Sequence, residues 1–319
     1  MASTFNIPSS LKLSQLKQLA FKCGLKTTGT KTILHSRLHH EITTATLRPA
    51  KSGKILSIDM GIRNLAYCVL KTPSLQAQES QKPTLDAWYR LAVSQAPSPK
   101  TATDGSKDIE VEKEAFDPAT LSRAAYSLLR ERLLIHKPAY ILIERQRFRS
   151  NGSAHILEWT VRVNMLESIL YAILHTLRAE GIWEGTVMAI APGKVGPFWV
   201  GEAVETAVKE KKEKVRKSKA AKIQNKGAKI DLVGNWLHGG DILQLGNKDV
   251  ERIAKAYSEK WDWVSTGKRR EKVELEPGEE KMGKLDDLAD CLLQGMAWIQ
   301  WEENKRLVLK QGVDALLSS

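Results

Sequence analysis

Cysteine is scarce in this sequence of 319 residues, and Cys23, Cys68 and Cys291 lie far apart in the chain. They form no C-x-x-C pair, so the pattern indicates neither a zinc cluster nor a disulfide framework, and a reducing compartment fits best. Long hydrophobic runs are missing as well, and the longest fall far short of the ~20 residues that a membrane span requires. No signal-peptide core is visible. We therefore expect a soluble protein that acts without a membrane.

Acidic residues are absent from the N-terminal stretch, where Glu41 is the first. This composition resembles an organellar transit peptide only weakly, because arginine is scarce and 11–38 has the periodicity of folded helices. Two short helices are expected in residues 1–45, and their pattern resembles the SAP module, a helix-extended-helix unit that binds DNA. The residues that carry this resemblance are Leu13, Leu16, Leu19, Cys23, Gly24, Leu25, Gly29, Lys31, Leu34, Arg37 and Leu38. A helical hairpin packed on the main domain or on a partner is the alternative.

Positive charge is in excess, with 49 Lys plus Arg against 37 Asp plus Glu and a net charge of +12. This balance favours a polyanionic partner, of which nucleic acid is the default. Ten Lys or Arg against two Glu fall within 209–229, including Lys217 and Lys219. A solvated helix face is the plain interpretation of such a run, and a surface that tracks phosphates is the other. The hydrophobic content of 42% is enough for one large domain over residues 50–319.

Two apolar runs each end on a carboxylate. Residues 55–58 predict a buried strand that ends at Asp59, with Gly61 allowing a tight hairpin into a second strand at 66–70. Residues 139–143 predict a central strand that ends at Glu144 and is followed by RQRFRS. Together with strands at 84–93 and 186–191 and helices at 117–136 and 153–180, these predict an α/β fold. We expect a mixed five-stranded sheet flanked by helices.

A late amphipathic helix, within 284–301, carries Asp286, Asp287 and Asp290 in its first turns. Acids at a helix start are common because they cap it and favour its dipole. Three acids exceed that need, and Asp290 lies in the apolar part of the pattern, where burial of an unpaired charge is costly.

These acids predict a metal site if they meet. Several carboxylates at close range repel one another unless cations neutralise them, and oxygen ligands favour Mg²⁺ or Mn²⁺. Two such ions about 4 Å apart activate water and stabilise the leaving oxygen of a phosphodiester. A basic protein bound to nucleic acid can use that chemistry.

Three segments, SIDMGIRNLAY, ILIERQRFRS and KLDDLADCLLQ, resemble the motif blocks of the fungal mitochondrial Holliday junction resolvases, relatives of bacterial RuvC in the ribonuclease-H-like superfamily. The resemblance spans about 54–301 and implies mitochondrial homodimers that bind four-way DNA junctions and nick them symmetrically with divalent metal. No small-molecule substrate is implied. The implied metal ligands and catalytic residues are Asp59, Glu144 and Asp290, completed by Asp287 or Asp286. The implied DNA contacts are Arg63, Arg145, Gln146, Arg147 and Arg149.

Other functions share parts of this pattern. Another ribonuclease-H-like nuclease, acting on RNA–DNA hybrids or in integration, would carry the same acids without needing a two-fold dimer. A non-catalytic junction-binding protein would need the basic charge alone. An actin-like ATPase also has D-x-G after an apolar strand, but its second glycine-rich phosphate loop has no match here.

Overall fold

The computed structural model describes residues 5–44, 53–73, 82–93, 116–146, 158–209, 219–266 and 284–317. The elements in chain order are α1 (Leu13–Lys22), α2 (Lys31–Thr43), β1 (Lys54–Asp59), β2 (Leu65–Lys71), β3 (Thr84–Leu91), α3 (Pro118–Ser127), η1 (Leu128–Leu133), η2 (Leu134–His136), β4 (Tyr140–Glu144), α4 (Glu158–Ala179), β5 (Thr186–Ile190), α5 (Pro192–Lys209), α6 (Lys219–Gly239), β6 (Gln244–Leu245), α7 (Lys248–Thr266), α8 (Leu285–Gln311) and α9 (Asp314–Leu317). Among these described helices, none is both long and apolar enough to cross a membrane.

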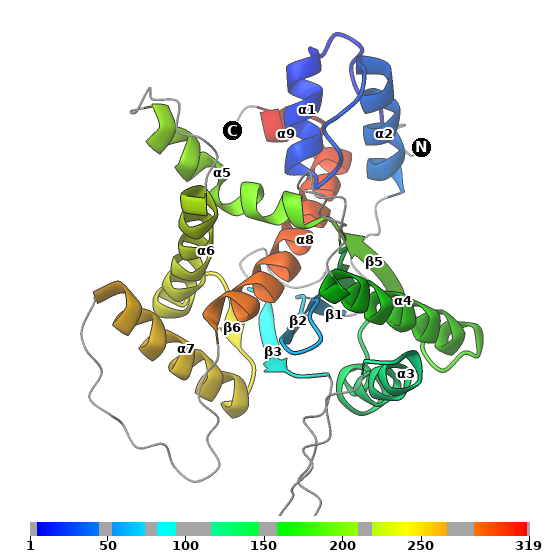
Figure 1. Ribbon diagram of the computed structural model, residues 1–319. Helices are drawn as coiled ribbons and strands as arrows, with labels where there is room; N and C mark the ends of the chain where they lie inside the picture. The colour runs from blue at the N-terminus through cyan, green and yellow to red at the C-terminus, as the bar shows by residue number, and fades with distance from the viewer. Residues whose placement is uncertain are drawn as a thin grey trace, which may run out of the picture.

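The centre of the fold is a mixed sheet with the strand order β5-β4-β1-β2-β3-β6 (Figure 1). β1, β2 and β3 form an antiparallel meander, whereas β4 pairs in parallel with β1, and β5 in parallel with β4. This arrangement of the first five strands is that of a ribonuclease-H-like sheet, which confirms the predicted fold class. A sixth strand, β6, adds two residues beside β3 that the sequence did not predict.

Helices cover both faces of the sheet (Figure 1). Side chains alternate along a strand, so Ile55 of β1 points into one apolar cluster and its neighbour Leu56 into the other. The first cluster joins the sheet to α8 and to residues of α5, α6 and α7. The second joins it to α3, η1 and α4. β1 is therefore covered on both faces, and its end is held in a fixed position.

The two N-terminal helices form as predicted and share an apolar cluster with the C-terminal end of the chain. Leu16 and Leu38 lie in one cluster with Val308 of α8 and Leu316 of α9. Asn304 Nδ2 donates a hydrogen bond of 2.6 Å to the Lys22 carbonyl. The helix pair therefore packs on the far end of α8 (Figure 1).

Two predictions of local structure were incomplete. The helix expected over 117–136 starts at the Asp117 cap, but it is α-helical to Ser127 and continues as π and 3-10 turns. It ends where expected because Lys137 adopts a left-handed φ of 52° before a proline. The strand expected at 186–191 ends at Ile190, and α5, which was not predicted, starts at Pro192, a position where the fixed φ of proline suits a helix.

Candidate active site

Asp59 and Glu144 end two neighbouring parallel strands. The register pairs Ile58 with Ile143, so the next residue of each strand lies at the same edge of the sheet. Burial, followed by the charge of Glu144 and a hydrogen bond from it, raises the pKa of Asp59 well above its ordinary value. The structure therefore brings the carboxyl groups of Asp59 and Glu144 together at this edge of the sheet.

The start of α8 adds two more carboxylates. Asp290 and Asp287 both act electrostatically on Asp59 and help to raise its pKa. Asp286 is not among the groups that shift Asp59, and its buried side chain pairs with Lys226 instead. The carboxylate cluster is thus Asp59, Glu144, Asp287 and Asp290. Because the last two are three residues apart, they share one face of the helix.

Close packing fixes α8 over the end of β1. Gln294, one turn after Asp290, donates from Nε2 to Ser57 Oγ at 3.0 Å and to the Ile58 carbonyl at 3.1 Å. A Cβ on Gly295 would lie 2.7 Å from a methyl group of Leu70, so the glycine permits this approach. These contacts set the position of Asp290 relative to Asp59.

Basic side chains that the sequence analysis did not single out contact the aspartates of α8. Arg90 Nε lies 2.8 Å from Asp287 Oδ2, and Arg90 also donates to Asn64 Oδ1. Lys229 Nζ lies 2.7 Å from Asp290 Oδ1. The hydrogen bond to Asp286 raises the pKa of Lys226. Two lysines of the lysine-rich segment, Lys226 and Lys229, therefore neutralise acids of α8.

The donor chemistry of the carboxylate cluster fits a divalent cation. Its oxygens are those that Mg²⁺ and Mn²⁺ prefer, and, after burial, the charges of Glu144, Asp290 and Asp287 contribute to the raised pKa of Asp59. Among the described residues, no group of three or more Asp, Glu, His or Cys side chains already surrounds a metal position. Asp287 and Asp290 instead contact the cationic groups of Arg90 and Lys229. A metal would have to replace those contacts.

A further carboxylate, Glu167 of α4, lies behind the cluster. Its Oε2 accepts a hydrogen bond of 3.1 Å from the backbone N–H of Gln146. Burial raises the pKa of Glu167, and the neighbouring charge of Glu144 raises it further. The side chain of Arg145 is exposed and close enough to act electrostatically on Glu167. Glu167 therefore anchors the segment that follows Glu144.

The remaining predicted DNA contacts are dispersed. Arg147, Arg149 and Lys217 lie outside the described residues, and Lys219 begins α6 with a side chain that is likewise not described. Lys31 is exposed at the start of α2, on the helix pair at the far end of α8 from Asp290 (Figure 1).

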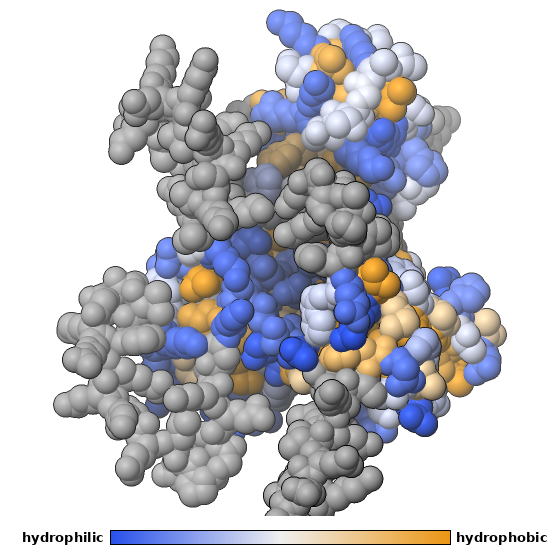
Figure 2. All heavy atoms as spheres, viewed as in Figure 1, coloured by the Kyte–Doolittle hydropathy of each residue, from blue (hydrophilic) through white to orange (hydrophobic). Residues whose placement is uncertain are grey.

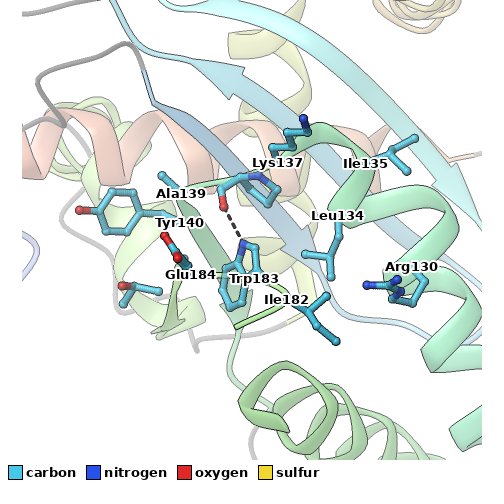
Figure 3. A pocket seen from close by; sticks show the side chains of 12 residues that line it. Arg130, Leu134, Ile135, Lys137, Ala139, Tyr140, Ile182, Trp183 and Glu184 are labelled. Carbon is cyan, nitrogen blue, oxygen red and sulfur yellow. Dashed lines mark hydrogen bonds between the residues drawn. The ribbon is translucent and has the colours of Figure 1, made fainter. Parts of the chain in front are cut away.

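A pocket of about 690 Å³ lies at the other ends of these strands, where β4 and β5 begin (Figure 3). It is lined by Tyr140 and Thr186, which begin β4 and β5, whereas Glu144 ends β4. Trp183 Nε1 donates 2.8 Å to the Pro138 carbonyl in its wall. The pocket contains none of the predicted site residues and is separate from the carboxylate cluster.

The chain is similar to known proteins over most of its length. The family model described as mitochondrial resolvase Ydc2 / RNA splicing MRS1 matches residues 55–308. Cruciform cutting endonuclease 1, mitochondrial, of Schizosaccharomyces pombe is 27% identical over 92% of this chain and 93% of its own, and the Saccharomyces cerevisiae protein of the same name is 25% identical over 92% and 82%. The crystal structure of the yeast mitochondrial Holliday junction resolvase Ydc2 is 25% identical, with a TM-score of 0.57 over 94% of this chain and 98% of that one.

Proposed function

From the premise that this chain belongs to the mitochondrial resolvase Ydc2 / RNA splicing MRS1 family, we propose that it is a mitochondrial endonuclease that resolves four-way DNA junctions. Its relatives are named mitochondrial cruciform cutting endonucleases, and the similar crystal structure is that of a Holliday junction resolvase. The observation that carries the proposal is the meeting of Asp59, Glu144, Asp287 and Asp290 at one sheet edge.

The reaction is hydrolysis of a phosphodiester. Water attacks phosphorus, the bond from phosphorus to O3′ breaks, and O3′ takes a proton, which leaves 5′-phosphate and 3′-hydroxyl ends. Mg²⁺ or Mn²⁺, most simply as two ions, would activate the water and stabilise the leaving oxygen. The residues that would hold it are Asp59, Glu144, Asp290 and Asp287. Asp286, which pairs with Lys226 and is not among the groups that shift the pKa of Asp59, is the weaker candidate.

The site also contains cations beside its carboxylates, namely Lys226, Lys229 and Arg90. Their charges offset the aspartates of α8 while no DNA is bound, and all three side chains remain partly exposed beside them. Phosphate oxygens offer these cations alternative partners. We propose that they move from carboxylate to phosphate as the junction binds, which frees the carboxylates for metal. The residues Arg63, Arg145, Arg147 and Arg149 would add further phosphate contacts.

Replacing Lys229 should therefore tighten metal binding in the absence of DNA. Lys229→Gln removes the ammonium group that contacts Asp290, so Mn²⁺ should bind about fivefold more tightly, which corresponds to about 1 kcal/mol for a partly exposed ion pair. Titration calorimetry of the full chain with Mn²⁺ measures this directly.

The matched control is Lys255→Gln, because Lys255 carries the same charge on α7 and pairs only loosely with Glu259 at 3.9 Å. It should leave Mn²⁺ affinity unchanged. Equal tightening in both variants would show a general effect of net charge, and no tightening in Lys229→Gln would show that the lysine does not compete with metal.

A nicking assay tests the proposed function itself. The protein is incubated with Mg²⁺ and a synthetic four-way junction, a linear duplex of the same arm sequence or an RNA–DNA hybrid. We expect paired, symmetrical nicks in the junction, which need two active sites and hence a homodimer. Preference for the hybrid would identify a ribonuclease H activity instead. Binding without cleavage would identify a non-catalytic protein, a result in keeping with the splicing protein named in the family description.

A further inference from the structure

Two arginines and two aromatic rings form a cluster beside the proposed active site. The guanidinium carbon of Arg63 lies 5.1 Å from the ring centroid of Trp159 and 5.7 Å from that of Phe116. The guanidinium carbon of Arg162 lies 4.2 Å from the Phe116 centroid. The rings of Phe116 and Trp159 meet edge to face, with centroids 5.6 Å apart. We call these four residues the aromatic–arginine cluster.

The aromatic–arginine cluster lies on the surface of the protein and not in its core. Trp159 is 39% exposed, which is unusual for so large a ring, and Arg63 is exposed too. Phe116 lies two residues before the start of α3, and Trp159 lies in the first turn of α4. Figure 2 shows hydrophobic residues gathered on the surface over these two helices. The edge-to-face contact with Phe116 and the guanidinium group of Arg63 hold the indole ring of Trp159 in one orientation.

The aromatic–arginine cluster lies close to the carboxylate cluster. Arg63 follows Asp59 by four residues, so at most about 14 Å of chain separates them. Trp159 precedes Glu167 by eight residues, or about 12 Å along α4, and Glu167 adjoins Glu144. At about 3.4 Å of helix axis per nucleotide, the exposed indole ring lies within about four nucleotides of a phosphate held at the carboxylates.

We infer that Trp159 is a stacking platform for an exposed nucleobase at the strand-exchange point of the junction, with Arg63 holding a flanking phosphate. Arg162 instead pairs with Glu158 and supports Phe116. This inference rests on the proposed function and deepens it by assigning the residue that distinguishes a junction from plain duplex. In a linear duplex every base pair is stacked on both faces. Where four arms meet, terminal base pairs expose a π face.

The chemistry of the cluster suits this ligand. A flat aromatic ring stacks on any base. The contact therefore depends on whether the face of a base is accessible and not on which base it is. An arginine beside the ring contacts phosphate, and this contact does not depend on the base sequence either. Phosphate contacts alone bind duplex and junction alike, because both carry the same backbone. The stack therefore supplies selectivity for structure.

The test compares the affinities of a four-way junction and of a linear duplex with the same arm sequence, both measured without divalent metal so that no cleavage occurs. Trp159→Ala should weaken junction binding about 10-fold, within the range for loss of one base–aromatic stack, and should leave duplex binding unchanged. Trp159→Phe keeps a π face and should retain most of the junction preference. Trp159→Leu keeps apolar bulk without the π face and should lose it.

Val161→Ala is the matched control, because Val161 is 48% exposed on the same helix and belongs to no part of the cluster. It should bind both DNAs as the wild type does. A Leu variant that binds junctions as well as the Phe variant would overturn the stacking role while leaving the nuclease intact. A wild-type protein that shows no preference for the junction would instead overturn the proposed function. The comparison of Phe with Leu holds even if the Ala variant fails to fold.

Discussion

Asp59→Asn is expected to leave junction binding intact and to slow cleavage in Mg²⁺ by at least about 1,000-fold, a loss of about 4 kcal/mol of transition-state stabilisation. The amide keeps the shape of the carboxyl group and its capacity to hydrogen-bond Glu144. It removes one negative charge from the cluster that would hold the metal. DNA binding should not suffer, because a carboxylate repels phosphate. Gel-shift and nicking assays on the same junction measure both quantities.

Asp249→Asn is the control, since Asp249 is an exposed acid at the start of α7, away from the carboxylate cluster. It should bind and cut at the wild-type rate. If Asp59→Asn cut as fast as this control, Asp59 would have no part in catalysis.

The same variant should also change how stability depends on pH when no metal is present. The pKa of Asp59 is raised in the folded protein, so the folded state keeps a proton that the unfolded chain releases above its ordinary pKa of 3.8. Its contribution to stability is therefore full below that value and is lost as pH rises through the raised folded value. Asp59→Asn cannot titrate and should lack this loss, which thermal melts across pH without metal would show.

Gly24→Ala should destabilise the protein by about 2–5 kcal/mol, the sum of left-handed backbone strain and overpacking. Gly24 has φ of +67° at the end of α1, and a Cβ there would lie 2.2 Å from the ring of Trp301. Trp301 is buried in α8 and has little room to move. The substitution therefore acts where the N-terminal helices pack on α8. Urea unfolding at equilibrium measures the loss.

Gly181→Ala separates the two causes. Gly181 has φ of +69° at the end of α4, almost the same backbone conformation, but an added Cβ would meet nothing within 4 Å. Gly181→Ala should lower the free energy of unfolding only by the backbone strain, about 1–2 kcal/mol. Equal losses in the two variants would mean that the indole ring moves aside without cost and that the N-terminal helices are loosely held.

Much of the fold follows from local patterns. The apolar runs before Asp59 and Glu144 predicted β1 and β4, and the spacing around Asp290 predicted α8, because burial of one face imposes a period on the sequence. α5 and α7 were missed. Pro192, at the start of α5, also suits the end of a strand.

The carboxylate cluster was predictable for the same reason. Acids at the ends of buried strands are conspicuous, and parallel neighbours place such ends at one edge. The choice between Asp286 and Asp287 was open, since both are within a helical turn of Asp290. The rotation of α8 favours Asp287, which acts electrostatically on Asp59, whereas Asp286 pairs with Lys226. Helical spacing alone contains no information about that rotation.

By itself, then, the sequence determined the strands, the acids at their ends and the helix that brings the last two carboxylates, because hydrophobic periodicity is a property of neighbouring residues. Only the tertiary structure decided which cations contact those acids and where Arg63 lies. Lys229 reaches Asp290 across 61 residues, and Arg90 reaches Asp287 across 197. Such pairs depend on how separate elements pack together. The periodicity of a sequence indicates which face of an element is buried, but it does not indicate which distant residue a charged side chain contacts.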